Sequence, residues 1–362
     1  MYIVTNRAVD NTGNIKAFGD TPNPKGPNEL RLVKVTQHNK TWRVEPLEDK
    51  LEQPRVDQLN KKFNLDINTN IPWHASLAVA CDIFEQAQKQ NKSILFFVHG
   101  YNNDVGDVLK TAEQLESLYN AIVVPFTWPA NGGGTISGTA SYLSDKADAR
   151  ASSGAFNRFV EKIQFFHTLM CTASLKSIAH KVEQKYQHRD NPMAAASLYT
   201  ELVSAVCKVK INLLCHSMGN YLLKHSLMTS DNKTSQLVFD NINLVAGDTN
   251  NENHAQWVDK IDVRKRIYVV INENDAALRV SRIKPGASQK ARLGHFLKSL
   301  NSEHCVYIDV TECEGVGNEH SYFKGEPVEQ NSALKALFDD IFNGRCVEKR
   351  LTYEAAENYY HL

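Results

Sequence analysis

Six short apolar runs recur along the chain, and segments with helical spacing separate them. The runs, rich in Val, Ile, Leu and Phe, cover residues 93–98, 121–126, 210–214, 241–246, 267–271 and 305–310. The segments that favour helices cover residues 76–88, 104–119, 220–228, 254–261 and 332–342. Alternation of continuous apolar strands with helices is typical of a parallel sheet buried on both faces. The pattern therefore predicts an α/β fold with a mostly parallel central sheet and helices on both faces.

Two regions depart from this alternation. Residues 1–72 contain short strand-like runs between turns rich in Gly, Pro and Asn, and we expect them to form an antiparallel extension at one edge of the sheet. Residues 131–205 open with Asn131-Gly132-Gly133-Gly134 and continue as largely helical sequence. A right-handed crossover needs a helix here, and the excess length predicts a helical lid as well. We expect one domain over residues 1–362 that contains both regions.

Composition limits the classes of partner. Hydrophobic residues make up 42% of the chain, which is enough for a sizeable core. Lys plus Arg and Asp plus Glu both number 41, so charge gives no reason to expect a nucleic-acid or membrane-surface partner. No stretch approaches the ~18 apolar residues of a membrane span. The first residues lack the pattern of a signal peptide. We expect a cytoplasmic protein, and the sequence identifies no protein partner.

The seven cysteines are odd in number and scattered, and no Cys-x-x-Cys pair occurs. This argues against a zinc ribbon or a redox dithiol. Free buried thiols in a reducing cytosol are the simplest interpretation. Cys207 and Cys215 are close in sequence, as are Cys305 and Cys313, so a disulfide stays open for either pair.

Ser217 stands between an apolar strand and an apolar helix start, in Cys215-His216-Ser217-Met218-Gly219. This arrangement resembles the Gly-x-Ser-x-Gly nucleophile elbow of the α/β-hydrolases, with Cys215 in place of the first glycine. Small residues are needed there because the nucleophile is held at strained dihedrals and the helix packs closely on the strand. For His216 we expect a structural role in the elbow. The alternative for Ser217 is a buried serine at a strand end.

A second motif, His99-Gly100-Tyr101, follows the strand 93–98. In α/β-hydrolases a His-Gly after an early strand shapes the loop that supplies one oxyanion-hole amide, and the residue after the nucleophile supplies the other. By this resemblance the backbone N–H groups of Tyr101 and Met218 would hold the oxyanion. His99 and Gly100 would line the substrate pocket. The alternative is an ordinary strand-to-helix turn.

A serine nucleophile needs a base, and the base needs an orienting acid. In this fold the chain order is serine, acid, histidine. Asp248 and Asp275 both follow apolar strands after Ser217, and Asp275 follows the second of these strands, which is the usual acid position. We therefore predict Asp275 as the acid, with Glu273 as a weaker competitor. For Asp248 we expect a cap on the helix near residue 253 or a place in the pocket lining.

The base is predicted to be His320, which lies in a loop after the last clear strand, as the fold requires. Three other histidines follow Asp275. His304 precedes that strand and would lie at the opposite edge of the sheet, His295 lies in a helix-like segment, and His361 stands near the end of the chain.

Aromatic residues near these motifs have two interpretations. Trp128, Tyr142 and Tyr322, together with Tyr101, would line an apolar acyl pocket or pack in the core. A metal site from His99, His216 and Asp248 has a spacing that matches no metal motif. We expect no metal and no other cofactor.

Motifs spread over residues 1–325 resemble those of a bacterial α/β-hydrolase family of unassigned function, a DUF900-like group. They are Val4-Thr5-Asn6-Arg7, Val98-His99-Gly100-Tyr101-Asn102, Pro125-Phe126-Thr127-Trp128-Pro129, Tyr142-Leu143-Ser144-Asp145 through Ala151-Ser152-Ser153, His216-Ser217-Met218-Gly219-Asn220, Asn274-Asp275-Ala276-Ala277-Leu278 and His320-Ser321-Tyr322. The resemblance also selects Asp275 as the acid.

The predicted triad and oxyanion loop lead us to expect a serine hydrolase that attacks an ester, thioester or amide carbonyl of a small-molecule acyl substrate, and esterase or lipase-like activity is the commonest outcome for this architecture. The sequence does not identify the acyl or leaving group. The alternatives are a catalytically silent binding or scaffold protein on a hydrolase fold, and an acyltransferase.

Overall fold

The computed structural model describes residues 1–39, 41–130, 139–186, 192–206, 209–229, 237–283 and 290–362. Within them, the strands of the main sheet are β1 (Tyr2–Thr5), β4 (Arg31–His38), β5 (Thr41–Pro46), β6 (Ser93–Val98), β7 (Ala121–Thr127), β8 (Ile211–His216), β9 (Asn241–Val245), β10 (Arg266–Ile271), β11 (Cys305–Asp309), β12 (Thr352–Glu354) and β13 (Tyr359–His361). They lie in the order β12-β13-β11-β10-β9-β8-β6-β7-β1-β4-β5. Neighbours from β13 to β1 run parallel, and antiparallel pairs lie at both edges.

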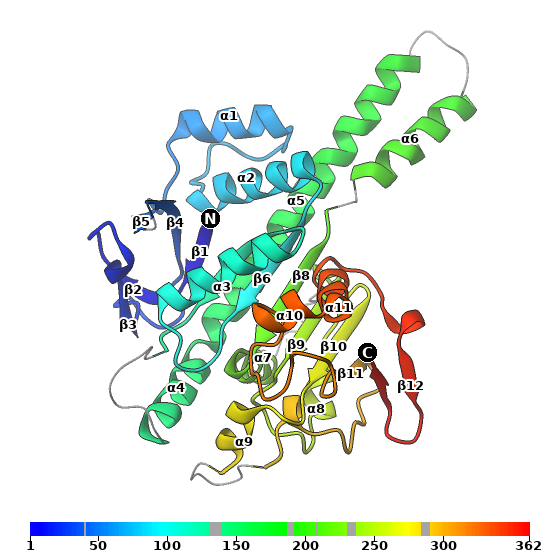
Figure 1. The fold of residues 1–362 in the computed structure, drawn as a ribbon. Helices are drawn as coiled ribbons and strands as arrows, with labels where there is room; N and C mark the ends of the chain where they lie inside the picture. Colours follow the sequence, from blue (N-terminus) through cyan, green and yellow to red (C-terminus); the bar gives the residue numbers. More distant parts are fainter. Residues whose placement is uncertain (40, 131–138, 187–191, 207–208, 230–236, 284–289) are drawn as a thin grey trace.

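Helices cover both faces of this sheet (Figure 1). The larger ones are α2 (Ala75–Gln90), α3 (Val105–Leu118), α5 (Ser153–Tyr186), α7 (Met218–Thr229) and α11 (Ser332–Phe342). Successive side chains of a strand point to opposite faces. Accordingly, Ile94 and Phe96 pack with α2, α5 and α7, whereas Leu95 and Phe97 pack with α3 and α11. The predicted α/β fold with a mostly parallel, doubly covered sheet is confirmed.

The N-terminal region forms the predicted antiparallel edge through β4 and β5. The strand β1 differs from the expectation because it also runs parallel to β7 and so belongs to the body of the sheet. A separate pair is formed by β2 (Arg7–Val9) and β3 (Phe18–Pro22). The helix α1 (Gln53–Phe63) occupies the following polar stretch, where only Val56 and Leu59 are buried.

The insertion expected at 131–205 contains α4 (Thr139–Ala151), α5 and α6 (Pro192–Val206). Its opening run Asn131–Gly134 lies outside the described residues. The helix α4 packs against α7, and α6 packs against the end of α5. In Figure 1 the hairpin of α5 and α6 projects from the end of the sheet opposite to α4. Of the segment predicted as a lid, α4 and α5 both pack against the elbow helix α7.

The remaining helices are α8 (Ala255–Val258), α9 (Ala276–Ile283) and α10 (Glu326–Gln330). Beyond α11 the chain adds β13 alongside β11 and β12 at the outer edge. The apolar pattern predicts no strand after residue 310, because β12 and β13 are short, polar and half exposed. No helix among the described residues combines the length and the apolar composition that crossing a bilayer requires.

The described cysteines are free thiols, including Cys305 and Cys313. Cys81 and Cys215 are buried as expected. The expectation of burial is wrong for Cys346, which is exposed. Cys207 lies outside the described residues.

Candidate active site

Ser217 forms the apex between β8, which ends at His216, and α7, which begins at Met218. Its φ of 53° lies in the left-handed region, which is costly for a residue with a side chain. A methyl group on Gly219 would lie 2.6 Å from the Val98 carbonyl oxygen, so only glycine allows α7 to approach β6 this closely. The strained, tightly packed apex predicted from the sequence is present.

Backbone and side-chain hydrogen bonds hold this apex in place. The Ser217 N–H donates to the Val245 carbonyl at 3.1 Å, and the Ser217 carbonyl accepts from the Asp248 N–H at 3.1 Å. The buried Asn220 side chain donates to the carbonyls of Cys215 and Ser217 at 2.9 and 3.0 Å. Cys215, which replaces the usual glycine, is completely buried beneath the turn.

The loop after β6 lies directly against the serine. A methyl group on Gly100 would stand 2.7 Å from the Ser217 Cβ and 3.1 Å from its Oγ. The Tyr101 amide therefore belongs to a loop in contact with the Ser217 side chain. Met218 is the first residue of α7, so its N–H has no acceptor within the helix. These are the two amides that are predicted to form an oxyanion hole.

His99 is buried below this loop and does not reach a carboxylate. Its Nε2 accepts from the Trp128 N–H at 3.2 Å and lies 3.0 Å from the Thr127 hydroxyl, so Nδ1 carries the proton and donates to the Gly100 carbonyl at 2.9 Å. The Trp128 ring stacks on His99 with centroids 5.0 Å apart. His99 and Trp128 thus form a packed pair that fixes the Gly100 carbonyl.

Arg7 extends this network, although the sequence pattern predicts no role in the site for this residue. Its guanidinium is 1% exposed. It donates to the Thr127 hydroxyl at 3.1 Å and to the carbonyls of Asn103 and Ala130, each at 3.2 Å. Burial lowers the pKa of Arg7 to about 10. The sequence signal for Arg7 is the motif at residues 4–7, which belongs to the family resemblance.

We expect His99 to make the fold sensitive to mild acid. Burial, with Arg7 adding to it, lowers the pKa of His99 to about 3, against about 6.5 in the unfolded chain. The unfolded state therefore binds the proton first, and stability falls as the pH drops below about 6.5. The loss attributable to this one residue is about 2 kcal/mol at pH 5.

Urea unfolding at pH 7.5 and at pH 5 measures this effect. His99→Asn keeps a donor near the Nδ1 position but does not titrate, so the variant is expected to lose less stability between the two pH values than the wild type. Equal losses of stability in the wild type and in His99→Asn would show that protonation of His99 does not cause the acid sensitivity.

His320 and Asp275 are joined directly. The His320 Nδ1 donates to the Asp275 Oδ2 at 2.6 Å, and the Asp275 side chain is completely buried. The other carboxylate oxygen accepts from the Leu278 N–H at 2.9 Å and so holds the first turn of α9. The Asn272 side chain donates to the carbonyls of Gly317 and Glu319, both at 3.1 Å. The loop that carries His320 is thus tied to the end of β10.

His216 connects this pair to the elbow. Its ring centroid lies 4.6 Å from that of His320, and its Nε2 donates to the His320 carbonyl at 3.1 Å. Burial, together with the nearby His320, lowers the pKa of His216. Because Ser217 follows His216 directly, the structure brings Ser217, His320 and Asp275 to one edge of the sheet. Within the described residues the Ser217 hydroxyl makes no hydrogen bond to His320.

The alternative acids and bases have other contacts. The Glu273 side chain accepts from the Leu297 N–H at 3.2 Å. His295 is buried, and neither of its ring nitrogens has a hydrogen-bond partner among the described residues. His304 comes just before β11, at the opposite edge of the sheet, and His361 lies in β13 at 3.5 Å from Asp309.

Asp248 does not cap a helix, in contrast to one expectation. Its carboxylate instead compensates the buried positive charge of Arg292. Its carboxylate pairs with the Arg292 guanidinium at 3.0 Å, and both side chains are at most 3% exposed. It also accepts from the hydroxyls of Tyr142 at 2.9 Å and Ser281 at 2.6 Å. Buried ions require such partners. Arg292 was missed because an isolated arginine in sequence is normally a surface residue.

The aromatic residues suggested for an acyl pocket are largely buried. Trp128, Tyr142 and Tyr322 are each at most 1% exposed. The Tyr322 hydroxyl donates to the Val270 carbonyl at 2.8 Å and accepts from the Ala246 N–H at 3.1 Å, which links the ends of β9 and β10. The Tyr101 ring packs against Tyr142 with centroids 5.6 Å apart. The part of the chain that the structure describes contains no cluster of three potential metal ligands.

Comparison with known protein families gives a match over most of the chain. Residues 78–182 and 172–328 match the family model described as an alpha/beta hydrolase of unknown function (DUF900). The matched segments include Gly100, Ser217, Asp275 and His320. Comparisons with curated proteins and with solved structures gave no match.

Proposed function

We propose that this chain, which belongs to the DUF900 family of α/β-hydrolases of unknown function, is a serine hydrolase. The observation that carries the proposal is the 2.6 Å hydrogen bond between His320 and the buried Asp275, beside the strained elbow of Ser217. An imidazole held by a buried carboxylate is the arrangement that activates a serine hydroxyl. The proposed substrate is an ester, thioester or amide, with an esterase or lipase-like preference.

In the proposed reaction the Ser217 Oγ attacks the carbonyl carbon while His320 removes the hydroxyl proton. Asp275 keeps the proton on Nδ1, so that Nε2 is the basic nitrogen, and it stabilises the imidazolium that forms. The amides of Tyr101 and Met218 stabilise the oxyanion. His320 then protonates the leaving group, and a water molecule activated by His320 hydrolyses the acyl-enzyme.

The hydrogen bond from Ser217 to His320 is proposed to form when substrate binds. Catalytic hydrogen bonds are often long or misaligned before a substrate is present. The free thiols of the described cysteines support the further proposal that the protein works in a reducing, cytoplasmic compartment.

A fluorophosphonate probe tests the proposal without knowledge of the substrate. We expect one equivalent of probe to label the folded wild-type protein, and Ser217→Ala to abolish labelling. Ser117→Ala is the matched control, because Ser117 is an exposed serine on α3 away from the elbow. Absence of label on the folded wild type would favour a catalytically silent binding protein, and label that survives in Ser217→Ala would place the nucleophile elsewhere.

A further inference from the structure

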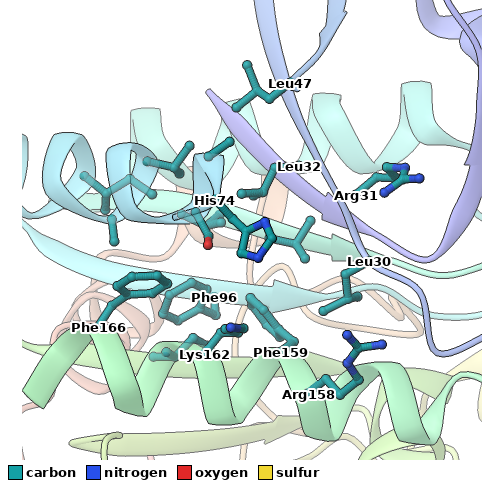
Figure 2. A pocket seen from close by; sticks show the side chains of 18 of the residues that line it. Leu30, Arg31, Leu32, Leu47, His74, Phe96, Arg158, Phe159, Lys162 and Phe166 are labelled. Atoms are coloured by element: carbon teal, nitrogen blue, oxygen red, sulfur yellow. The ribbon is translucent and has the colours of Figure 1, made fainter. Parts of the chain in front are cut away.

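A second candidate site lies on the face of the sheet that α2 and α5 cover, away from the Ser217 elbow. It is a cavity of about 440 Å³, which falls within the usual range for ligand pockets. Its floor is formed by strand residues such as Phe96 and Ile211, and its walls by α2 and α5. Figure 2 shows Phe159 and Phe166 of α5 facing Leu30, Leu32 and other side chains across the space.

The cavity is separate from the proposed active site. Ile211 is the first residue of β8, and Ser217 follows it by six positions, or about 20 Å of extended strand. The lining contains none of Gly100, Ser217, Asp275 or His320.

The chemistry of the walls favours a ligand with a large apolar part. Most of the lining residues are apolar, and the strand and helix side chains at the floor, such as Phe96, Ile211 and Phe166, carry no hydrogen-bonding group. A cavity of ~150 Å³ accepts benzene, and this one is about three times larger. It therefore suits an unbranched hydrocarbon chain of roughly 12–16 carbons, on the same volume comparison.

The rim carries an excess of positive charge. Four Lys or Arg residues line the cavity, Arg31, Lys50, Arg158 and Lys162, against three acidic residues, Glu29, Glu48 and Asp49. Arg31 pairs with Asp49, and Arg158 pairs with Glu29.

Lys50 and Lys162 are the lining cations outside these two pairs, and Lys162 is the one that lies beside Phe159 of the aromatic wall. It has no ion-pair partner among the described residues. It lies one helical turn from Arg158, and like charges at this spacing repel each other. Figure 2 shows both side chains on α5 on either side of Phe159. Arg158 is already paired with Glu29, so an anionic group at this rim would mainly supply the partner for Lys162.

From these observations we propose that the cavity binds a long-chain fatty carboxylate. The hydrocarbon chain lies among Phe96, Phe159 and Phe166, and the carboxylate meets Lys162 and Arg158. This site does not depend on the proposed hydrolase activity.

Calorimetric titration of the delipidated full-length protein with dodecanoate tests the proposal. We expect one site that Ser217→Ala leaves unchanged and that Lys162→Glu weakens about tenfold. Lys181→Glu, an exposed lysine further along α5, is the matched control and is expected to bind like the wild type. Dodecyltrimethylammonium, which has the same chain and a cationic head, is expected to bind more weakly than dodecanoate to the wild type.

The following results would each overturn the proposal. Absence of binding up to about 1 mM, which marks only very weak affinity, rejects the site. Equal binding of the two amphiphiles, or equal loss in the Lys162 and Lys181 variants, rejects the role of the rim. To test the cavity itself, Ala80→Phe introduces a ring at a lining position of α2, and a folded variant that binds dodecanoate normally would exclude this location.

Discussion

Replacing Asp275 with asparagine is expected to slow fluorophosphonate labelling of Ser217 by about 10,000-fold, the loss seen when the orienting acid of a serine triad becomes an amide. The asparagine Oδ1 still accepts from the Leu278 N–H and so preserves the start of α9. What changes is the group that faces His320. An amide there favours the wrong tautomer and cannot stabilise the imidazolium. The second-order rate constant of labelling measures this change without a known substrate.

Two further variants separate Asp275 from the competing acids. Glu273→Gln alters the neighbouring carboxylate on the same loop, and Asp248→Asn alters the acid one strand earlier. We expect both to label within a few-fold of the wild type when folded. A large loss of labelling in either variant, with Asp275→Asn unaffected, would show that the residue altered in that variant is the acid and that Asp275 is not. Circular dichroism establishes that each variant is folded before its rate is compared.

The strands that could be predicted from the sequence are those buried on both faces. The runs at β6, β8 and β10 are mostly apolar because each face packs against helices. The edge strands β12 and β13 carry no such apolar pattern, because their side chains are half exposed or exposed and can be polar. Their pairing with β11 is set by tertiary contacts that no local pattern encodes.

The same distinction applies to the candidate site. Ser217 and Gly100 could be identified because a strand, a sharp turn and a helix are local features of the chain. The contact between His320 and Asp275 was anticipated only through the strand order of a family, since 45 residues separate the two. Arg7 and Arg292 were missed because the acceptors that make their burial possible come from distant segments. Buried charges of this kind are specified by the whole fold.

Arg292→Met is expected to cost about 3–5 kcal/mol of stability, because it leaves the Asp248 carboxylate buried without its counter-ion. Hydroxyl donors from Tyr142 and Ser281 remain, but they do not neutralise the carboxylate of Asp248, whose side chain is 3% exposed. A loss of this size is a large share of the ~5–15 kcal/mol that stabilises a typical protein. The midpoint of urea unfolding, at constant m-value, measures it.

The pair between Arg266 and Glu348 supplies the matched control, because the Arg266 side chain is 45% exposed. Arg266→Met is expected to cost less than about 1 kcal/mol, since exposed ion pairs contribute little. The double variant Arg292→Met with Asp248→Leu removes both buried charges and is expected to recover much of the loss. Equal costs for the two arginine variants would show that Asp248 is not held by Arg292. Additive losses in the double variant would show that the two residues stabilise the fold independently.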